Sequence, residues 1–262
     1  MLHDVIPLEY PHLVSSAAVA HHARMVRTVA RHADCLIFNS KHAKERVDLA
    51  LRSHGRMGVP NLVRWLPLPD ASAKGEASIP ELAEVDYFVV VSTIEPRKNH
   101  DLLVRVWRRL VSTRGLSAPH LIIIGSLGYK SEEICASYDR EPLLKSRIHL
   151  ISGLSSQGLA ALVLGANGLL SPSFAEGFGL PVLEAKALGV PVLASDIAAH
   201  REIGGAHTEL LPTDDEESWE IAILRLMESR FRTSPSITPD LIEDSYCADI
   251  LRFLKRVAEG PI

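Results

Sequence analysis

Cysteine and long apolar runs are both scarce in this sequence, and each shortage excludes a class of protein. The three cysteines, Cys35, Cys135 and Cys247, lie far apart and form no Cys-x-x-Cys pair. This spacing argues against a disulfide framework or a zinc site and favours a reducing compartment. No uninterrupted apolar run approaches the ~18 residues that a membrane span needs. We therefore expect a cytoplasmic protein whose only membrane contact would be peripheral, on the inner face of the membrane.

Signals of secretion, metal binding and dinucleotide binding are also absent. The residues before Ala20 lack a basic segment and are interrupted by Pro7 and Pro11, so we expect no signal peptide. There is no Asp-x-Asp motif and no group of histidines with metal-ligand spacing, and we expect no metal ion. No Gly-x-Gly-x-x-Gly follows the first strand of the regular region that begins at residue 85, which disfavours a dinucleotide oxidoreductase.

The charge that is present is unevenly spread along the 262 residues. Residues 1–74 carry ten Lys and Arg against six Asp and Glu, although the whole chain has a net charge of -4. Within this segment Arg24, Arg27 and Arg31 fall on one face of a helix expected over residues 12–33. The face could meet a phosphate-bearing acceptor or an anionic lipid surface, or it could be an ordinary solvated helix face.

The order of apolar and polar segments predicts an α/β protein with two Rossmann-like parts. Residues 1–74 hold the helix over 12–33, a strand at 35–38, a helix capped by Asn39 or Ser40 and a strand at 62–66. From residue 85, short apolar runs alternate with helical stretches, which indicates a parallel sheet covered on both faces. The expected strands are 87–91, 121–124, 148–151, 169–170, 190–194 and 209–211, and the expected helices are 99–113, 131–145, 155–165, 180–188 and 216–229.

These patterns divide the chain into three parts. Residues 1–74 form one part, residues 75–238 form a complete second domain, and a terminal helix at about 239–258 begins the third, 239–262. The segment 67–80, rich in Pro, Ala, Ser and Gly, is the expected linker between the first two. The terminal helix could pack back on the N-terminal part.

Three of the segments that follow predicted strands carry positive charge or glycine. Ligands bind beyond the carboxyl ends of the strands in an open parallel sheet. Arg97 and Lys98 follow the first strand of the regular region, and Gly125 follows the second. Two adjacent cations next to a glycine-containing turn favour an anionic ligand.

A glycine-rich segment follows the fourth strand. Gly177 and Gly179 permit close backbone approach, and Pro181 suits the first turn of the helix that follows. Free amides and the helix dipole would meet at this point, which predicts a phosphate site. Taken singly, the glycines could serve only the turn and Lys98 could be a surface lysine, but their convergence on one rim favours a ligand site.

Two carboxylates, Glu176 and Glu184, stand eight residues apart in and after this segment. Glu184 lies in an otherwise apolar helix, where a carboxylate needs a partner. Pairing with Lys186 or solvation is one interpretation. Accepting hydrogen bonds from the paired hydroxyls of a ribose is the other, with Glu176 nearer the sugar to be transferred.

At these residues the sequence resembles glycosyltransferase family 4, whose members have the GT-B fold. Residues 172–185, Pro-Ser-Phe-Ala-Glu-Gly-Phe-Gly-Leu-Pro-Val-Leu-Glu-Ala, resemble the E-x7-E signature of that family. Residues 93–99 resemble its donor-phosphate loop, and 121–125 its second C-domain strand. The resemblance is strong over about 85–230 and looser over 1–66.

The resemblance implies retaining, metal-independent transfer from a nucleotide-diphosphate sugar. Lys98 would bind the diphosphate with help from the amides of Phe178, Gly179 and Leu180. Glu184 would bind the nucleotide ribose, and Glu176 would contact hydroxyls of the donor sugar. The Glu-Pro-Arg-Lys-Asn variant at 95–99 and Gly-Tyr at 128–129 resemble a branch rich in mannosyltransferases of bacterial polysaccharide synthesis, so GDP-mannose is the leading donor.

The chain departs from the family pattern in two places. The family often has an arginine at the position of Thr93, and Arg97 could substitute for it. His3-Asp4 resembles a His-Asp pair whose histidine touches the donor sugar, although His3 could equally belong to a frayed terminus.

Family members have about a hundred further residues before this His-Asp pair. The N-terminal Rossmann-like domain would then be partial, and a second chain could complete it.

Two other functions stay open. The first is a catalytically incomplete module that holds a sugar nucleotide but builds no site for the glycan or lipid-linked acceptor. The second is a nucleotide-sugar epimerase or a phosphorylase of similar two-domain build. Nucleotide binding without transfer would support the first, and an epimerised sugar nucleotide without any acceptor would support the second.

Overall fold

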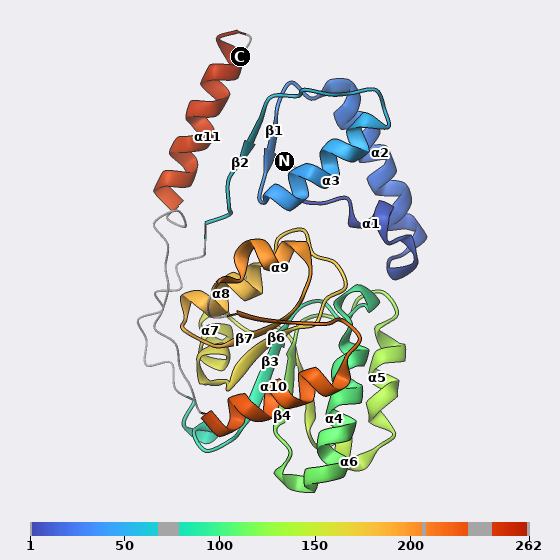
Figure 1. The fold of residues 1–262 in the computed structure, drawn as a ribbon, viewed down its shortest axis with the longest axis vertical. Helices are drawn as coiled ribbons and strands as arrows, with labels where there is room; N and C mark the ends of the chain where they lie inside the picture. The colour runs from blue at the N-terminus through green and yellow to red at the C-terminus, as the bar shows by residue number, and fades with distance from the viewer. Residues whose placement is uncertain (1, 68–78, 206–207, 230–242, 261–262) are drawn as a thin grey trace. The chain divides into compact units, whose positions relative to one another are not determined.

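The computed structural model describes residues 2–67, 79–205, 208–229 and 243–260, which form two compact units (Figure 1). The first unit comprises residues 1–69, 175–179 and 237–262, and the second comprises residues 70–174 and 180–236. Most of the linker predicted at 67–80 lies outside the described residues.

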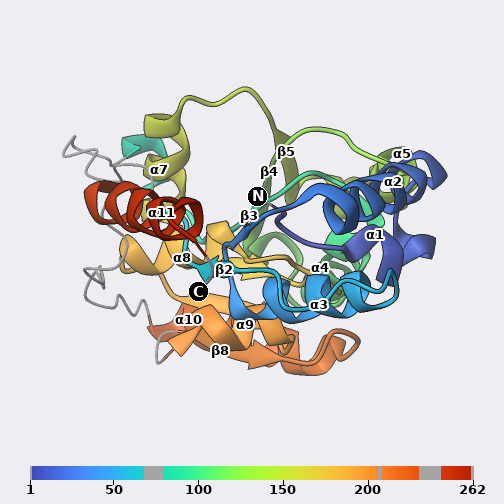
Figure 2. The same ribbon diagram turned by 90° about the horizontal axis from the view of Figure 1, so that it is seen from above.

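The second unit is built on a sheet of six parallel strands in the order β5-β4-β3-β6-β7-β8, which confirms the predicted α/β class (Figures 1 and 2). The register is regular, with Val89 of β3 opposite Ile122 of β4 and Leu169 of β6. The order places β3 between β4 and β6, so the carboxyl ends of these three strands are neighbours. The strands are β3 (Tyr87–Val91), β4 (His120–Ile124), β5 (Ile148–Ile151), β6 (Gly168–Ser171), β7 (Val192–Ser195) and β8 (Thr208–Leu211).

Helices cover both faces of this sheet because its central strands are apolar on both sides. Phe88 faces a core that includes Trp107 of α4 and Trp219 of α10, all fully buried. Tyr87, the preceding residue, donates its hydroxyl to the carbonyl of Leu162 in α7. Side chains alternate between the faces of a strand, so these two residues show both faces buried. The helices are α4 (His100–Arg114), α5 (Ser131–Asp139), α6 (Pro142–Lys145), α7 (Ser156–Gly165), α8 (Leu180–Ala187), α9 (Ala198–Ile203) and α10 (Glu216–Ser229).

The first unit has a parallel pair of strands with helices around a small apolar core. The core includes Phe38 of β1, Val26 of α2 and Val47 of α3, all 1% exposed or less. Ser40 caps α3 by accepting a hydrogen bond from the Ala43 amide at 2.9 Å, as one of the two predicted caps. The elements are α1 (Ile6–Glu9), α2 (Ser16–His32), β1 (Leu36–Phe38), α3 (Lys41–Arg52), β2 (Asn61–Val63) and α11 (Glu243–Ala258).

The terminal helix α11 belongs to the first unit by its contacts. Arg64 forms an ion pair with Asp249 at 3.0 Å and donates to the Ser245 hydroxyl at 2.9 Å. The predicted start of this helix, 239–242, lies outside the described residues. Within the described ranges, no helix is both long and apolar enough to cross a membrane.

Several predicted elements differ from the structure. The helix expected over 12–33 is divided into a 3-10 helix at Pro11–Leu13 and α2, which begins at Ser16 after its cap, Ser15. The single helix expected over 131–145 is two helices, α5 and α6, because Pro142 has no amide to continue the first and instead begins the second. Helix α9 was not predicted, since its six residues are too few to show a helical period.

Candidate functional site

The segments after β3, β4 and β6 are hydrogen-bonded to one another at the carboxyl edge of the sheet. The amide of Ile94 donates to the carbonyl of Ser126 at 2.9 Å, and the amide of Gly128 donates back to Ile94 at 3.0 Å. The amide of Phe174 donates to the carbonyl of Arg97 at 3.0 Å. These bonds hold three neighbouring loops together where a ligand of an open parallel sheet binds.

The cations predicted for the site lie in a short 3-10 helix, η3 (Pro96–Lys98), directly before α4. The Arg97 guanidinium donates to the carboxylate of Glu95, at 2.7 Å and 3.1 Å, and both side chains are less than a fifth exposed. This pairing offsets the charge of Arg97 within its own loop. Lys98, next to it, is half-buried.

The close approach of the backbones after β3 and β4 requires glycine at position 125. A Cβ atom at this position would lie 1.9 Å from the Ser92 carbonyl oxygen and 2.7 Å from its carbon. Both are backbone atoms of the neighbouring loop, so a larger residue would force the strand ends apart. A Cβ on Gly128 would lie 2.6 Å from the side chain of Thr93, in the same pair of loops.

The glycine-rich loop, residues 175–179, contacts the N-terminal residues of the first unit. The Ser40 hydroxyl donates to the carbonyl of Gly177 at 2.8 Å. A Cβ on Gly177 would lie 2.8 Å from the carbonyl oxygen of His3 and 3.0 Å from the Cβ of Asp4. The structure therefore brings together His3 and Gly177, two predicted site residues that are far apart in the sequence. The His3 side chain itself is exposed.

The rest of this loop leads into α8 as the sequence predicts. Phe178 is buried and packs edge-on against Trp65, with ring centroids 5.9 Å apart. Gly179 has a φ of 97°, in the region that favours glycine, and Leu180 then begins α8. The first amides of a helix have no partner within the helix, so those after Gly179 are oriented to receive an anion.

The two predicted carboxylates have different surroundings. Glu176 is only 9% exposed. Burial raises the pKa of Glu184, and no described residue forms a hydrogen bond or an ion pair with its carboxylate. The alternative partner, Lys186, instead donates to the carbonyl of Ile203 at the end of α9. Glu184 is thus a half-buried carboxylate without a hydrogen-bond or ion-pair partner among the described residues.

Sequence reasoning missed a histidine beneath the η3 loop. His100 begins α4, is fully buried, and has its Nε2 3.2 Å from the Ser92 hydroxyl at the end of β3. Burial, with a smaller effect of the Lys98 charge, lowers the pKa of His100 to about 4, so the ring is neutral at pH 7. In the sequence, the only indication that His100 lies near the site is that it stands two residues after Lys98.

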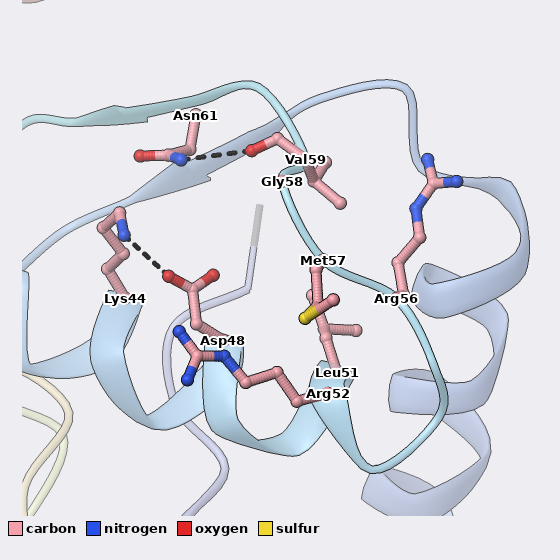
Figure 3. Close-up of a pocket in the computed structure, with 9 residues that line it drawn as sticks. All are labelled: Lys44, Asp48, Leu51, Arg52, Arg56, Met57, Gly58, Val59 and Asn61. Atoms are coloured by element: carbon pink, nitrogen blue, oxygen red, sulfur yellow. Dashed lines mark hydrogen bonds and ion pairs between the residues drawn. The ribbon is translucent and has the colours of Figure 1, made fainter.

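A separate pocket of about 150 Å³ lies in the first unit between α3 and β2 (Figure 3). Lys44 pairs there with Asp48 at 2.6 Å, while the guanidinium of Arg56 points away and donates to the carbonyl of Ala33. None of the predicted site residues lines this pocket. Among the described residues, no three His, Cys, Asp or Glu side chains form a group that could hold a metal ion.

A sequence comparison identifies the family to which this fold and these loops belong. The family described as "Glycosyl transferases group 1" matches residues 76–237, which is more than half of the chain. The chain belongs to the group 1 glycosyltransferases. This assignment covers the second unit almost entirely, including the segments after β3, β4 and β6.

The curated relatives of this group 1 glycosyltransferase include bacterial mannosyltransferases. It is 27% identical over 220 residues to the serotype-specific mannosyltransferase WbdA of Escherichia coli, covering 79% of this chain and 27% of that protein. It is 30% identical over 138 residues to the O-antigen chain mannosyltransferase RfbU of Salmonella typhimurium, covering 53% and 37%. The chain therefore spans only a quarter to two fifths of the length of these relatives.

Solved structures confirm the predicted GT-B type of α/β fold for this glycosyltransferase. Anabaena HepE in complex with UDP-glucose superposes with a TM-score of 0.71 at 18% identity, covering 98% of this chain and 70% of that one. Sucrose-phosphate synthase from Thermosynechococcus elongatus gives a TM-score of 0.66 at 22% identity, covering 86% and 57%. At these identities the likeness concerns the fold.

Proposed function

We propose that this chain is a retaining, metal-independent hexosyltransferase of glycosyltransferase family 4. It would move a sugar, with mannose as the leading candidate, from a nucleotide-diphosphate sugar to a polysaccharide or lipid-linked acceptor. The observation that carries the proposal is the half-buried carboxylate of Glu184, which lies in an otherwise apolar helix and has no hydrogen-bond or ion-pair partner among the described residues. A ribose supplies two hydroxyl donors, which would satisfy that carboxylate.

The diphosphate is assigned to Lys98 and to the amides of Phe178, Gly179 and Leu180. Helix-start amides and a lysine suit a phosphate, because both present positive charge without a metal ion. When the bond from the anomeric carbon to the diphosphate breaks, negative charge grows on the leaving oxygen. Groups fixed beside that oxygen lower the barrier, since they need no rearrangement during the reaction.

The donor sugar is assigned to Glu176 and His3. A buried carboxylate such as Glu176 can accept hydrogen bonds from sugar hydroxyls, and the contact of the His3 backbone with Gly177 keeps this histidine next to the same loop. Gly125 and Arg97 are the remaining residues of the proposed donor site. Gly125 allows the ends of β3 and β4 to approach each other, and Arg97 stabilises η3 by its ion pair with Glu95.

The acceptor of the reaction and the location of the protein are also part of the proposal. The printed name of the relative RfbU, an O-antigen chain mannosyltransferase, supports a glycan or lipid-linked acceptor. A cytoplasmic location is part of the same proposal. Arg24, Arg27 and Arg31 are exposed on α2, and no Asp or Glu occurs between Glu9 and Asp34. This surface would suit peripheral contact with an anionic membrane.

Replacing Lys98 tests the diphosphate assignment. We expect Lys98→Ala to weaken binding of a nucleoside diphosphate about tenfold or more and to leave nucleoside binding unchanged, because a charge-assisted hydrogen bond is lost only to the phosphates. Isothermal titration calorimetry with GDP and guanosine measures both. Lys145→Ala, which removes an exposed lysine on α6, is the matched control. Equal weakening of both ligands would remove Lys98 from the phosphate site.

A further inference from the structure

Asn99, the residue between Lys98 and α4, has an unusual backbone conformation. Its φ is 55° and its ψ is 39°, in the left-handed region that glycine adopts most readily. Asparagine is the side chain that best tolerates this region. Glycine would fit the backbone at least as well, so the conformation alone does not explain the amide side chain.

The side chain of Asn99 joins the ends of three strands in the second unit. It is 4% exposed, and its Nδ2 donates to the carbonyl of Pro172 at 3.0 Å and to the carbonyl of Thr213 at 2.9 Å. Asn99 itself follows β3, Pro172 follows β6, and Thr213 follows β8. Both amide hydrogens therefore hold neighbouring loops at the carboxyl edge of the sheet.

The backbone on each side of Asn99 is fixed as well. Its own amide donates to the carbonyl of Pro96 at 3.0 Å, and its carbonyl accepts from the amide of Leu102 at 3.2 Å. Beyond Lys98, the carbonyl of Arg97 accepts from the amide of Phe174 in the loop after β6. Lys98 thus lies between two residues, Arg97 and Asn99, that are both hydrogen-bonded to the loop after β6.

We propose that Asn99 is a positioning residue that sets where Lys98 meets the phosphates, without touching the donor itself. The inference rests on the proposed diphosphate role of Lys98. The chain segment through Pro172 continues into the glycine-rich loop and the start of α8, which supply the amides of the same phosphate site. By bonding to Pro172, Asn99 fixes the lysine loop relative to the beginning of that segment.

The position of the lysine loop affects phosphate binding, because a charge-assisted hydrogen bond needs its donor nitrogen at about 2.7–2.9 Å from the acceptor oxygen. Removal of the Asn99 amide would take a donor from the carbonyls of Pro172, which is buried, and of Thr213, which is half-buried. It would also let η3 move relative to the loop after β6. The expected result is weaker binding of phosphates, with little change for a ligand that has none.

The test uses Asn99→Gly, which keeps the left-handed backbone and removes the two side-chain hydrogen bonds. Asn99→Asp is the second variant, since it keeps the size of the side chain but has no amide hydrogens. The control is Asn167→Gly at the opposite edge of the sheet, where Asn167 also makes two side-chain hydrogen bonds, to Asp86 and to the Tyr87 amide. Urea unfolding reports the stability of each variant.

Calorimetry with GDP and guanosine then separates the outcomes. We expect Asn99→Gly and Asn99→Asp to bind GDP about tenfold more weakly with unchanged guanosine binding, and Asn167→Gly to bind both as the wild type does. In a Lys98→Ala background, Asn99→Gly should weaken GDP binding no further, because Asn99 acts through the lysine. A stable Asn99→Gly protein with wild-type GDP affinity, or additive losses in the double variant, would overturn the positioning role. If Lys98→Ala alone leaves GDP binding unchanged, the proposed function fails instead.

Discussion

The carboxylate of Glu184 lowers the stability of the folded protein, and it is the group proposed to bind a ribose. Its carboxylate is partly buried in α8, has no described partner and has a raised pKa because of that burial. A raised pKa means that the folded state favours the neutral acid, so above that pKa the charged form lowers stability. Such an arrangement is typical of groups that are satisfied only when a ligand binds.

Glu184→Gln should therefore change stability and affinity in opposite directions. We expect the free energy of unfolding at pH 7 to rise, because the buried charge is gone, and the affinities for guanosine and GDP to fall together by about tenfold. Urea unfolding and calorimetry measure the two effects. Glu132→Gln, on the exposed surface of α5, should change neither. Unchanged guanosine affinity in Glu184→Gln would exclude the ribose role.

His100 makes the stability of the second unit depend on pH. Its pKa of about 4 in the folded protein lies below the ordinary value of 6.5, mainly because of burial. The unfolded state therefore takes up a proton first as the pH falls. The stabilisation is complete above about pH 6.5 and decreases toward pH 4, by about 3 kcal/mol in total.

His100→Gln should remove this dependence while keeping a polar group beside Ser92. Urea unfolding at pH 7 and at pH 4 should show the wild type losing about 3 kcal/mol more than the variant across this range. If the wild type and the variant lose stability equally, the histidine is not buried in its neutral form.

At the scale of elements, Ser40 serves both α3 and the glycine-rich loop. Its hydroxyl oxygen accepts from the Ala43 amide at the start of α3, and the hydroxyl donates to the carbonyl of Gly177. The side chain is 1% exposed, so water cannot replace either bond.

Ser40→Ala should lower the free energy of unfolding by about 2 kcal/mol, since a cap alone contributes ~1 kcal/mol and a second buried bond is lost. Ser15→Ala is the matched control, because Ser15 caps α2 through Ala18 and makes no described bond to the loop. Urea unfolding compares the two. Equal losses would mean that the bond to Gly177 contributes nothing.

The elements also show what the sequence could and could not predict. The central strands were predictable because they are short, largely apolar runs, and the cap of α3 was predictable because Ser40 precedes a helical period. The break at Pro142 was visible in the sequence, yet the apolar period continues across it. The bonds of Asn99 and Ser40 join residues 73 to 137 positions apart, and no local pattern carries information about such contacts.

At the scale of the whole molecule, the family assignment and the candidate site depend on the same segments. The matched region, 76–237, contains Lys98, Glu184 and the glycine-rich loop, and these motif residues could be proposed from the sequence because they are close together in it. The proximity of His3 to Gly177 was less accessible, since only the fold brings the backbones of these two residues together. The sugar, the base and the acceptor depend on shape that these motifs do not specify.

The central claim, that this chain binds a nucleotide-diphosphate sugar without a metal ion, is tested most directly by thermal stabilisation. The wild-type protein would be heated with GDP-, UDP- and ADP-sugars in the presence of EDTA. A ligand at a hundred times its Kd stabilises the folded state by about 2.7 kcal/mol, so the melting temperature should rise by several degrees. We predict that rise, saturable and largest with GDP-mannose. No stabilisation by any of these sugar nucleotides at millimolar concentration would contradict the account.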